Sequence, residues 1–125
     1  MARSRVLIAD DNEALRETTN DILTREGYEV VEAADGEAAL AVLARSSVDV
    51  LILDLAMPRL NGVEVLRQID APPPAVIVQS ALALFHEDDL RREAGRKLFC
   101  VLRKPVAPGE LISAVSRATH GAEDA

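Results

Sequence analysis

The stretch DVLILDLAMPRLNG, residues 49–62, decides the fold. Residues 50–53 are an unbroken apolar run, which is typical of a β-strand buried on both faces. The run stops at the carboxylate of Asp54, and the Met-Pro and Asn-Gly pairs that follow are turn-forming sequences. The stretch therefore predicts a central strand that places a carboxylate at its carboxyl end, just before the chain turns into a helix.

The rest of the chain repeats this pattern of a short apolar run followed by residues with helical spacing. Most of the runs are continuously apolar, which favours a parallel sheet with helices over both faces, a doubly wound α/β fold. The run YEVVEA carries two glutamates and fits an edge strand better. The predicted strands are 5–9, 28–33, 48–53, 75–79 and 98–102, and the predicted helices are 13–26, 36–45, 62–70, 86–94 and 108–118.

Several helices have recognisable starts. Asp35 is suited to cap the second helix, and Asn61 with Glu64 three residues later has the pattern of a capping box. In the first helix, the apolar stripe is expected to include Leu15 and Leu23. These signals support an ordered succession of helices between the strands.

Composition points to an acidic protein with one domain. The 125 residues fit a single domain, 1–125, with a core over about 4–118 and a tail over 119–125. The net charge of −7 argues against direct binding of nucleic acid, and no apolar run reaches the length of a membrane helix. Cys100 is the single cysteine, so a reducing compartment and a cytoplasmic location are expected.

Polar side chains follow four of the predicted strands. Asp10 and Asp11 follow the first, Asp54 the third, Ser80 the fourth and Lys104 the fifth. Ligands of doubly wound folds bind at this edge of the sheet. Three carboxylates held together repel one another unless a cation relieves them, and oxygen ligands of this kind suit Mg²⁺. The sequence therefore predicts an acidic magnesium site.

Simpler interpretations stay open for single residues. The aspartates together with Asn12 could serve as caps of the first helix, and Ser80 or Lys104 alone could be a surface residue. The Lys104–Pro105 bond is a candidate for the cis form. Both common nucleotide-binding fingerprints are absent from the sequence, and Asp54 is the one well-placed nucleophile, as carboxylates can accept a phosphoryl group.

This set of residues resembles the receiver domain of two-component response regulators, close to the single-domain chemotaxis type. The resemblance covers about residues 4–118 and implies a flavodoxin-like (βα)5 fold with strand order 2-1-3-4-5. It rests on the pair Asp10-Asp11, the turn Asp54-x-x-Met57-Pro58-x-x-Asn61-Gly62, Ser80 followed by Ala81, and Lys104-Pro105.

The resemblance implies a role for each matching residue. Asp54 is expected to be the phosphorylated residue, assisted by Ser80 and Lys104. Mg²⁺ is expected on Asp10, Asp11, Asp54 and the backbone carbonyl of Ala56. The domain is then a signalling switch that catalyses only its own phosphorylation and dephosphorylation.

The same resemblance implies partners. A sensor histidine kinase or a histidine phosphotransfer protein would supply the phosphoryl group. An output protein or domain would dock on the face formed by residues 86–103, and a phosphorylation-dependent homodimer is a further expectation. No membrane partner is expected.

Two features depart from the family pattern. The family has an aromatic switch residue three positions before the lysine, where this chain has Val101; Phe99 is the nearest ring and could replace it through a bulge. Ala56 and Leu82 are apolar at places where family members often carry polar groups that influence dephosphorylation. We therefore expect a dephosphorylation rate unlike that of fast chemotaxis regulators.

Two alternative functions stay open. The first is a phosphorylation-independent interaction module, favoured by Val101. The second is a magnesium-dependent phosphatase or phosphotransferase with an aspartyl nucleophile. The second is disfavoured because such enzymes usually carry another aspartate where this chain has Ala56.

Overall fold

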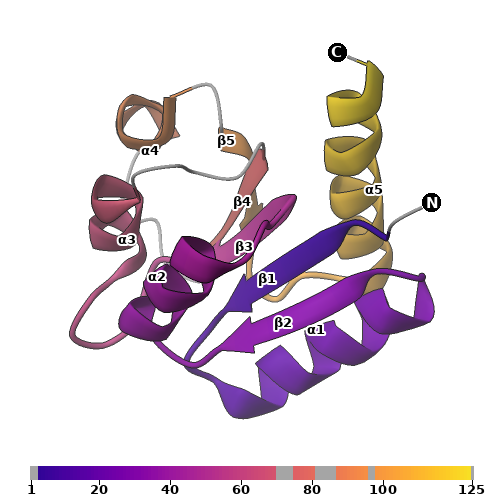
Figure 1. Ribbon diagram of the computed structural model, residues 1–125, viewed down its shortest axis with the longest axis horizontal. Coiled ribbons are helices and arrows are strands. Elements are labelled where there is room, and N and C mark those ends of the chain that lie inside the picture. The colour runs from indigo at the N-terminus through magenta and orange to yellow at the C-terminus, as the bar shows by residue number, and fades with distance from the viewer. Residues whose placement is uncertain (1–2, 70–74, 81–86, 96–97, 125) are drawn as a thin grey trace.

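The computed structural model describes residues 3–69, 75–80, 87–95 and 98–124, in which strands and helices alternate (Figure 1). Each predicted strand and helix has a counterpart. The elements are β1 (Arg5–Ala9), α1 (Glu13–Arg25), β2 (Glu29–Ala33), α2 (Gly36–Arg45), β3 (Val50–Asp54), α3 (Gly62–Gln68), β4 (Ala75–Ser80), α4 (Glu87–Ala94), β5 (Leu98–Arg103) and α5 (Pro108–Asp124).

The strands form one parallel sheet in the order β2-β1-β3-β4-β5. This confirms the predicted order and the edge position of β2. Near the carboxyl ends of the two neighbouring strands, Ala9 of β1 pairs with Leu53 of β3. Asp10 follows Ala9 and Asp54 follows Leu53, so this pairing brings the two aspartates together at the carboxyl edge of the sheet.

The helices cover both faces of the sheet, with α1 and α5 on one face and α2, α3 and α4 on the other (Figure 1). Successive residues of β3 alternate between two apolar clusters. Leu51 and Leu53 pack with the cluster on the α2–α4 side, whereas Val50 and Ile52 pack with the cluster that includes Leu23 of α1 and residues of α5. All of β3 is buried, so the strand is rigidly held up to Asp54.

The predicted helix caps are present. The side chain of Asp35 accepts a hydrogen bond from the Ala38 N–H at 2.8 Å. Asn61 and Glu64 bond each other's backbone N–H groups, which confirms the capping box at the start of α3. Each cap contributes about 1 kcal/mol to stability. The box also fixes where the chain turns after Asp54.

Two expectations for the helices are wrong. Leu15 is 45% exposed, so it lies outside the buried stripe of α1, which contains Leu23. Helix α5 continues to Asp124 instead of ending at residue 118. Within the added part Thr119 is buried, and its hydroxyl donates to the Ser116 carbonyl at 3.0 Å.

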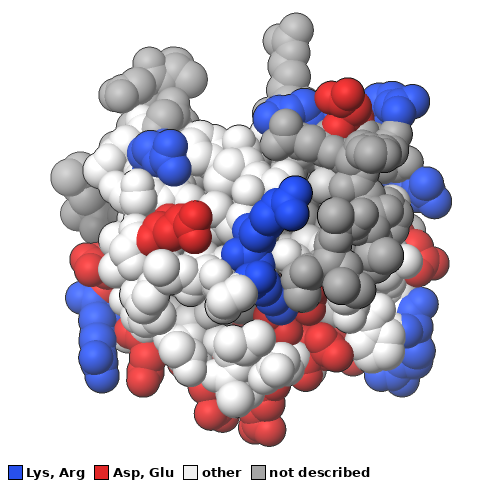
Figure 2. All heavy atoms as spheres, turned by 180° about the vertical axis from the view of Figure 1, so that it is seen from behind, with Lys and Arg blue, Asp and Glu red and all other residues white. Residues whose placement is uncertain are grey.

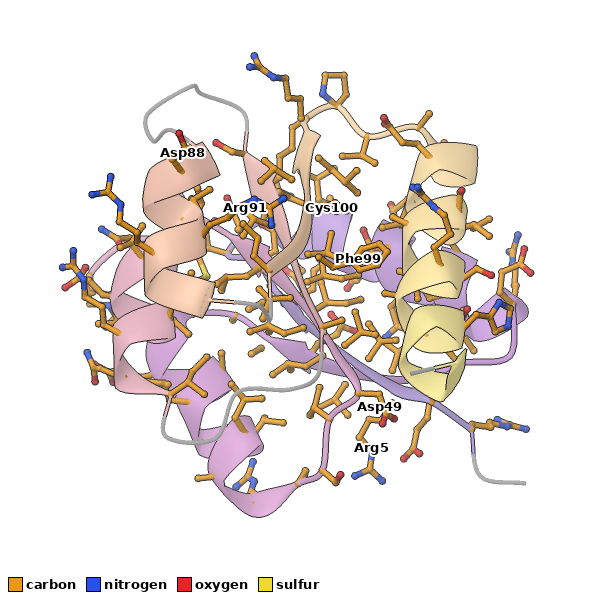
Figure 3. All side chains as sticks on the ribbon, turned by 90° about the horizontal axis from the view of Figure 1, so that it is seen from above. Arg5, Asp49, Asp88, Arg91, Phe99 and Cys100 are labelled. Carbon is orange, nitrogen blue, oxygen red and sulfur yellow. The ribbon has the colours of Figure 1, made fainter. Side chains whose placement is uncertain are left out.

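Strand β5 contains an extra residue. Val76 of β4 pairs with Leu98, but the next residue, Ile77, pairs with Cys100, so Phe99 is bulged out of the register. As a result Phe99 and Cys100 both pack on the α5 side of the sheet, whereas Val101 packs on the α4 side. Figure 3 shows the Phe99 ring between β5 and α5.

The described surface carries both charge signs. On the face seen in Figure 2, Lys and Arg side chains are scattered, and acidic side chains gather along the lower edge. Among the described residues, none of the helices combines the length and apolar character needed to cross a membrane.

Candidate functional site

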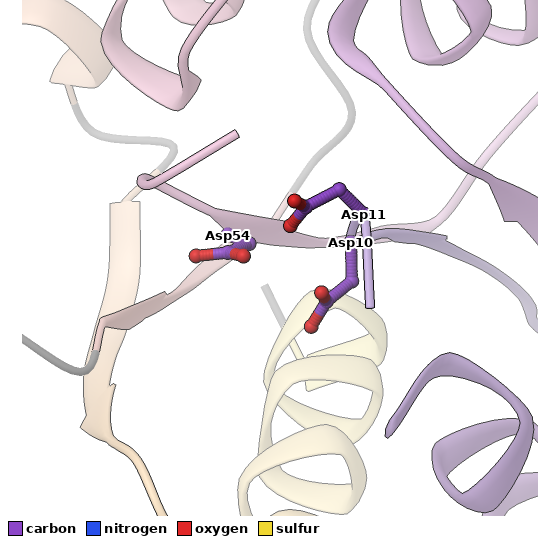
Figure 4. A group of neighbouring side chains, drawn as sticks. All are labelled: Asp10, Asp11 and Asp54. Carbon is purple, nitrogen blue, oxygen red and sulfur yellow. The ribbon is translucent and has the colours of Figure 1, made fainter. Parts of the chain in front are cut away.

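Three carboxylates meet at the carboxyl ends of β1 and β3 (Figure 4). One oxygen from each of Asp10, Asp11 and Asp54 lies within 4.8 Å of the others. Asp10 and Asp54 are buried and Asp11 is exposed. The predicted acidic cluster is therefore present, and its open side is at Asp11.

Asp54 is held at both carboxylate oxygens. The Ala56 N–H donates to Oδ1 at 3.0 Å, and the ammonium of Lys104 lies 3.3 Å from Oδ2. Burial raises the pKa of Asp54 above its usual value, and the Ala56 hydrogen bond and the Lys104 charge offset this only in part. A cation at the site therefore helps to keep this carboxylate ionised.

Lys104 connects two of the carboxylates. Its Nζ donates to Asp10 Oδ2 at 2.9 Å and lies 3.3 Å from Asp54 Oδ2. Burial opposes the charged form, but the bond and charge of Asp10 and the charge of Asp54 outweigh it, so the pKa of Lys104 is raised. The Lys104 N–H donates to the Ser80 carbonyl at 3.0 Å, and the bond to Pro105 is cis, as predicted.

Asp10 and Asp11 differ in how they are held. Asp10 Oδ1 accepts from the Asn12 N–H at 2.9 Å, and Asn12 in turn caps α1 through the Leu15 N–H at 3.1 Å. The capping role thus belongs to Asn12. Asp11 makes no hydrogen bond or ion pair with another described residue. Its carboxylate therefore needs no rearrangement of other bonds before it can take a ligand.

The remaining candidate residues lie in β4, in the turn after β3 and in β5. Ser80 is the last residue of β4, is half-buried, and pairs with Arg103 of β5 in the sheet. Ala56 is exposed in the turn after Asp54. Val101 and Phe99 lie on opposite sides of β5, so the bulge does not place the Phe99 ring where an aromatic at 101 would lie. Ala81 and Leu82 fall outside the described residues.

Sequence reasoning missed one residue of the site, Arg16. Its Nη1 donates to the backbone carbonyl of Asp10 at 2.8 Å, and its Nε bonds Glu32 Oε1 at 2.8 Å. A long side chain in the first helix gives no pattern that points to a carbonyl six residues earlier. Glu32 lies on the edge strand β2, where a glutamate in the sequence indicates only exposure to solvent.

Residues 6–116 match the family model of the response regulator receiver domain. The chain belongs to this family. The receiver domain is 37% identical to the response regulator MprA of Mycobacterium avium (strain 104), over 97% of this chain and 54% of that protein. It is 36% identical to the transcriptional regulatory protein PdtaR of Mycobacterium tuberculosis (strain CDC 1551 / Oshkosh), over 91% of this chain and 56% of that protein.

The chain thus spans about half the length of these two relatives. Solved receiver structures match over nearly their full length. A CheY-like receiver domain protein from Methanospirillum hungatei JF-1 aligns with a TM-score of 0.87 and 25% identity, covering 99% of this chain and 100% of that one. The chemotaxis regulator CheY4 of Vibrio cholerae aligns with a TM-score of 0.82 and 26% identity, covering 94% and 99%.

Proposed function

We propose that this receiver domain, residues 1–125, is a phosphorylation switch of a cytoplasmic two-component pathway, with Asp54 as the phosphorylated residue. The observation that carries the proposal is the buried carboxylate of Asp54, beside the Lys104 ammonium at 3.3 Å and within 4.8 Å of two further carboxylates. Three carboxylates beside one ammonium leave an excess of negative charge, which a divalent cation of the kind used in phosphoryl transfer would neutralise.

The donor is a phosphohistidine of a sensor kinase or of a histidine phosphotransfer protein. A carboxylate oxygen of Asp54 attacks phosphorus, the phosphorus–nitrogen bond breaks, and the imidazole leaves with the electron pair and takes up a proton. Lys104 stabilises negative charge on the transferring oxygens. The Ala56 N–H keeps Oδ1 in place, so the attacking oxygen has a fixed orientation.

The carboxylates fit Mg²⁺ by number, charge and burial. Asp10, Asp11 and Asp54 would hold it together with the Ala56 carbonyl, and the bound ion would supply positive charge for the transferring oxygens. Hard oxygen donors with one exposed member leave room for the water that Mg²⁺ retains. Asp11 is the ligand with no competing bond among the described residues.

Phosphorylation adds charge and strong acceptors to Asp54. Lys104 and the Ser80 hydroxyl are the groups that would bond the new oxygens. Because the Lys104 N–H is bonded to the Ser80 carbonyl, a shift of Lys104 would also act on the end of β4. The movement would change the face of residues 86–103, where an output partner or a second copy of the domain docks.

Incubation with a small phosphodonor and Mg²⁺, followed by intact-mass measurement, tests the proposal. We expect one added phosphoryl group on the wild type and none on Asp54→Asn. Asp49→Asn is the matched control, since Asp49 is an exposed aspartate just before β3, at the opposite end of that strand. Equal modification of wild type and Asp54→Asn would contradict the proposal.

The metal role has its own pair of variants. Asp11→Asn should need far more Mg²⁺ for the same rate, whereas Glu13→Gln, an exposed acid in the first turn of α1, should behave as wild type. A rate that does not depend on Mg²⁺ would remove the metal from the mechanism. Absence of phosphorylation with intact binding of an output partner would favour the phosphorylation-independent module.

A further inference from the structure

Arg16 connects the acidic cluster to the edge of the sheet. Its Nη1 donates to the Asp10 carbonyl at 2.8 Å, and its Nε donates to Glu32 Oε1 at 2.8 Å. The Arg16 side chain is 13% exposed and that of Glu32 30% exposed. The two bonds use different nitrogens of one planar guanidinium, so its orientation is fixed from both sides.

Glu32 is itself held by a second residue of α1. The amide nitrogen of Asn20 donates to Glu32 Oε2 at 2.7 Å, and the Thr24 hydroxyl donates to the amide oxygen of Asn20 at 2.7 Å. Each carboxylate oxygen of Glu32 thus has its own donor. The chain of bonds runs from the surface of α1 through β2 to the backbone of the site.

The carbonyl that Arg16 bonds belongs to the peptide unit joining Asp10 to Asp11. The other polar groups of Asp10 are bonded elsewhere: its N–H to the Ala33 carbonyl at 3.1 Å, Oδ1 to Asn12 and Oδ2 to Lys104. Asp11 has no bond to another described residue. That peptide unit therefore sets where the Asp11 backbone lies, and the Asp11 carboxylate extends from it.

We propose that Arg16, fixed by Glu32, is a positioning residue for the divalent cation site, acting through the Asp10–Asp11 peptide. This rests on the proposed function, because the site must bind Mg²⁺ for its affinity to be set. Groups that orient metal ligands commonly change affinity by about 10–100-fold when removed. Arg16 bonds the backbone and not a ligand oxygen, so we expect about a tenfold effect.

Charge alone predicts the opposite result, which makes the test sharp. Arg16 is positive, so its removal should strengthen cation binding if only charge matters. In Arg16→Met combined with Glu32→Gln the pair is removed without changing net charge. Positioning predicts weaker binding for Arg16→Met and for the double variant, whereas charge alone predicts tighter binding for the first and unchanged binding for the second.

Calorimetric titration of the full chain with Mg²⁺ gives the affinity directly. The half-saturating Mg²⁺ concentration for phosphorylation by a small phosphodonor gives a second readout. We expect Arg16→Met to raise both constants about tenfold while the rate at saturating Mg²⁺ stays near that of the wild type. General destabilisation raises half-saturation only where part of the protein is unfolded, because binding must then also refold the chain. Circular dichroism of Arg16→Met without Mg²⁺ shows whether the variant is fully folded, and in a fully folded variant a raised constant reports the site itself.

Arg5→Met is the matched control. Arg5 also pairs with a glutamate of β2, Glu29, at 3.1 Å, but at the other end of the strands, where Figure 3 shows Arg5 beside Asp49. Its Mg²⁺ affinity should equal that of the wild type. If Arg16→Met does not fold, Arg16→Lys serves instead, because a lysine cannot bond both partners with the same geometry and should also bind Mg²⁺ less tightly.

The inference is overturned if Arg16→Met, or Arg16→Lys where it is used, binds Mg²⁺ as tightly as the wild type or more tightly. That result would leave the proposed function intact. A wild type that takes up neither Mg²⁺ nor a phosphoryl group overturns the proposed function, and the inference with it. Equal weakening in Arg5→Met also overturns the inference, since it would assign the effect to any loss of an ion pair on β2.

Discussion

Lys104 and Asp10 are 94 residues apart in the chain, and the Lys104 ammonium lies 2.9 Å from Asp10 Oδ2. The same ammonium lies 3.3 Å from Asp54 Oδ2. One ammonium therefore serves two buried carboxylates. This arrangement stabilises the fold, because neither carboxylate is buried without a cation beside it.

Replacing Lys104 by methionine should destabilise the metal-free protein. The substitution keeps most of the side-chain volume but leaves Asp10 and Asp54 buried without their cation. Breaking a buried pair in this way costs about 3 kcal/mol. Urea unfolding at neutral pH, followed by circular dichroism, measures the loss, and added Mg²⁺ should recover part of it. Arg103→Met, which changes the exposed neighbour, is the control and should change little.

Asp54→Asn should stabilise the metal-free protein at neutral pH. Folding raises the pKa of Asp54, so the folded state holds this proton more tightly than the unfolded chain, whose pKa is near 3.8. Stability is therefore lost as the pH rises from that value through the raised folded pKa, about 1.4 kcal/mol for each unit of difference. Asparagine does not ionise and avoids this loss.

The difference in stability between Asp54→Asn and wild type should grow as the pH rises above about 4, level off above the raised folded pKa, and vanish in more acidic solution. Glu17→Gln, an exposed residue of α1, makes the same change in net charge and should show no such dependence. A wild type that is more stable than Asp54→Asn across the whole range would contradict the assignment.

Gly62→Ala should disturb the packing of the start of α3 against the backbone of Asp54 and Leu55. A Cβ at Gly62 would lie 2.8 Å from the Asp54 carbonyl oxygen and 2.9 Å from the Leu55 Cα, both fixed backbone atoms. Overpacking of this kind costs about 1–3 kcal/mol. Gly109→Ala in the first turn of α5 is the matched control, since nothing lies within 4 Å of its Cβ. Denaturant midpoints compare the two, and Gly109→Ala should be unchanged or slightly stabilised.

Phe99→Leu should lower stability without affecting signalling. The ring packs on the α5 side of β5, away from α4, so the substitution costs about 1 kcal/mol of packing. Nuclear magnetic resonance shifts with and without beryllofluoride and Mg²⁺ report the change on the α4 face. They should match wild type in Phe99→Leu and differ in Val101→Ala, which alters the α4 side. Loss of the shift changes in Phe99→Leu would make Phe99 the switch residue after all.

Much of the fold was predictable because it depends on local patterns. Continuous apolar runs identified the buried strands, and the paired signals of Asn61 and Glu64 identified the start of α3. The carboxyl ends of parallel strands share one edge of the sheet. For this reason, the meeting of Asp10, Asp54 and Lys104 followed from their places after the strands.

The features that escaped prediction depend on three-dimensional packing. Helical spacing predicts that Leu15 belongs to the buried stripe of α1. In the structure Leu15 is exposed, and it is the neighbouring Arg16 that faces the edge of the sheet and bonds Glu32. The polar sequence after residue 118 suggested a tail, yet Ala118 and Thr119 are buried and α5 continues. A bulge near Phe99 is among the expectations from the sequence, but the side of the sheet on which the Phe99 ring lies depends on the pairing with β4, which no local signal in β5 specifies.

The parts of the site enter the chain in a fixed order during translation. The acidic residues of β1 and β3 are synthesised first, and the ammonium that neutralises them arrives only with the fifth strand. A sheet formed before Lys104 has left the ribosome would bury Asp10 and Asp54 without their cation, so folding of the shorter nascent chain is disfavoured. The acidic site is therefore completed only when the chain through Lys104 has emerged.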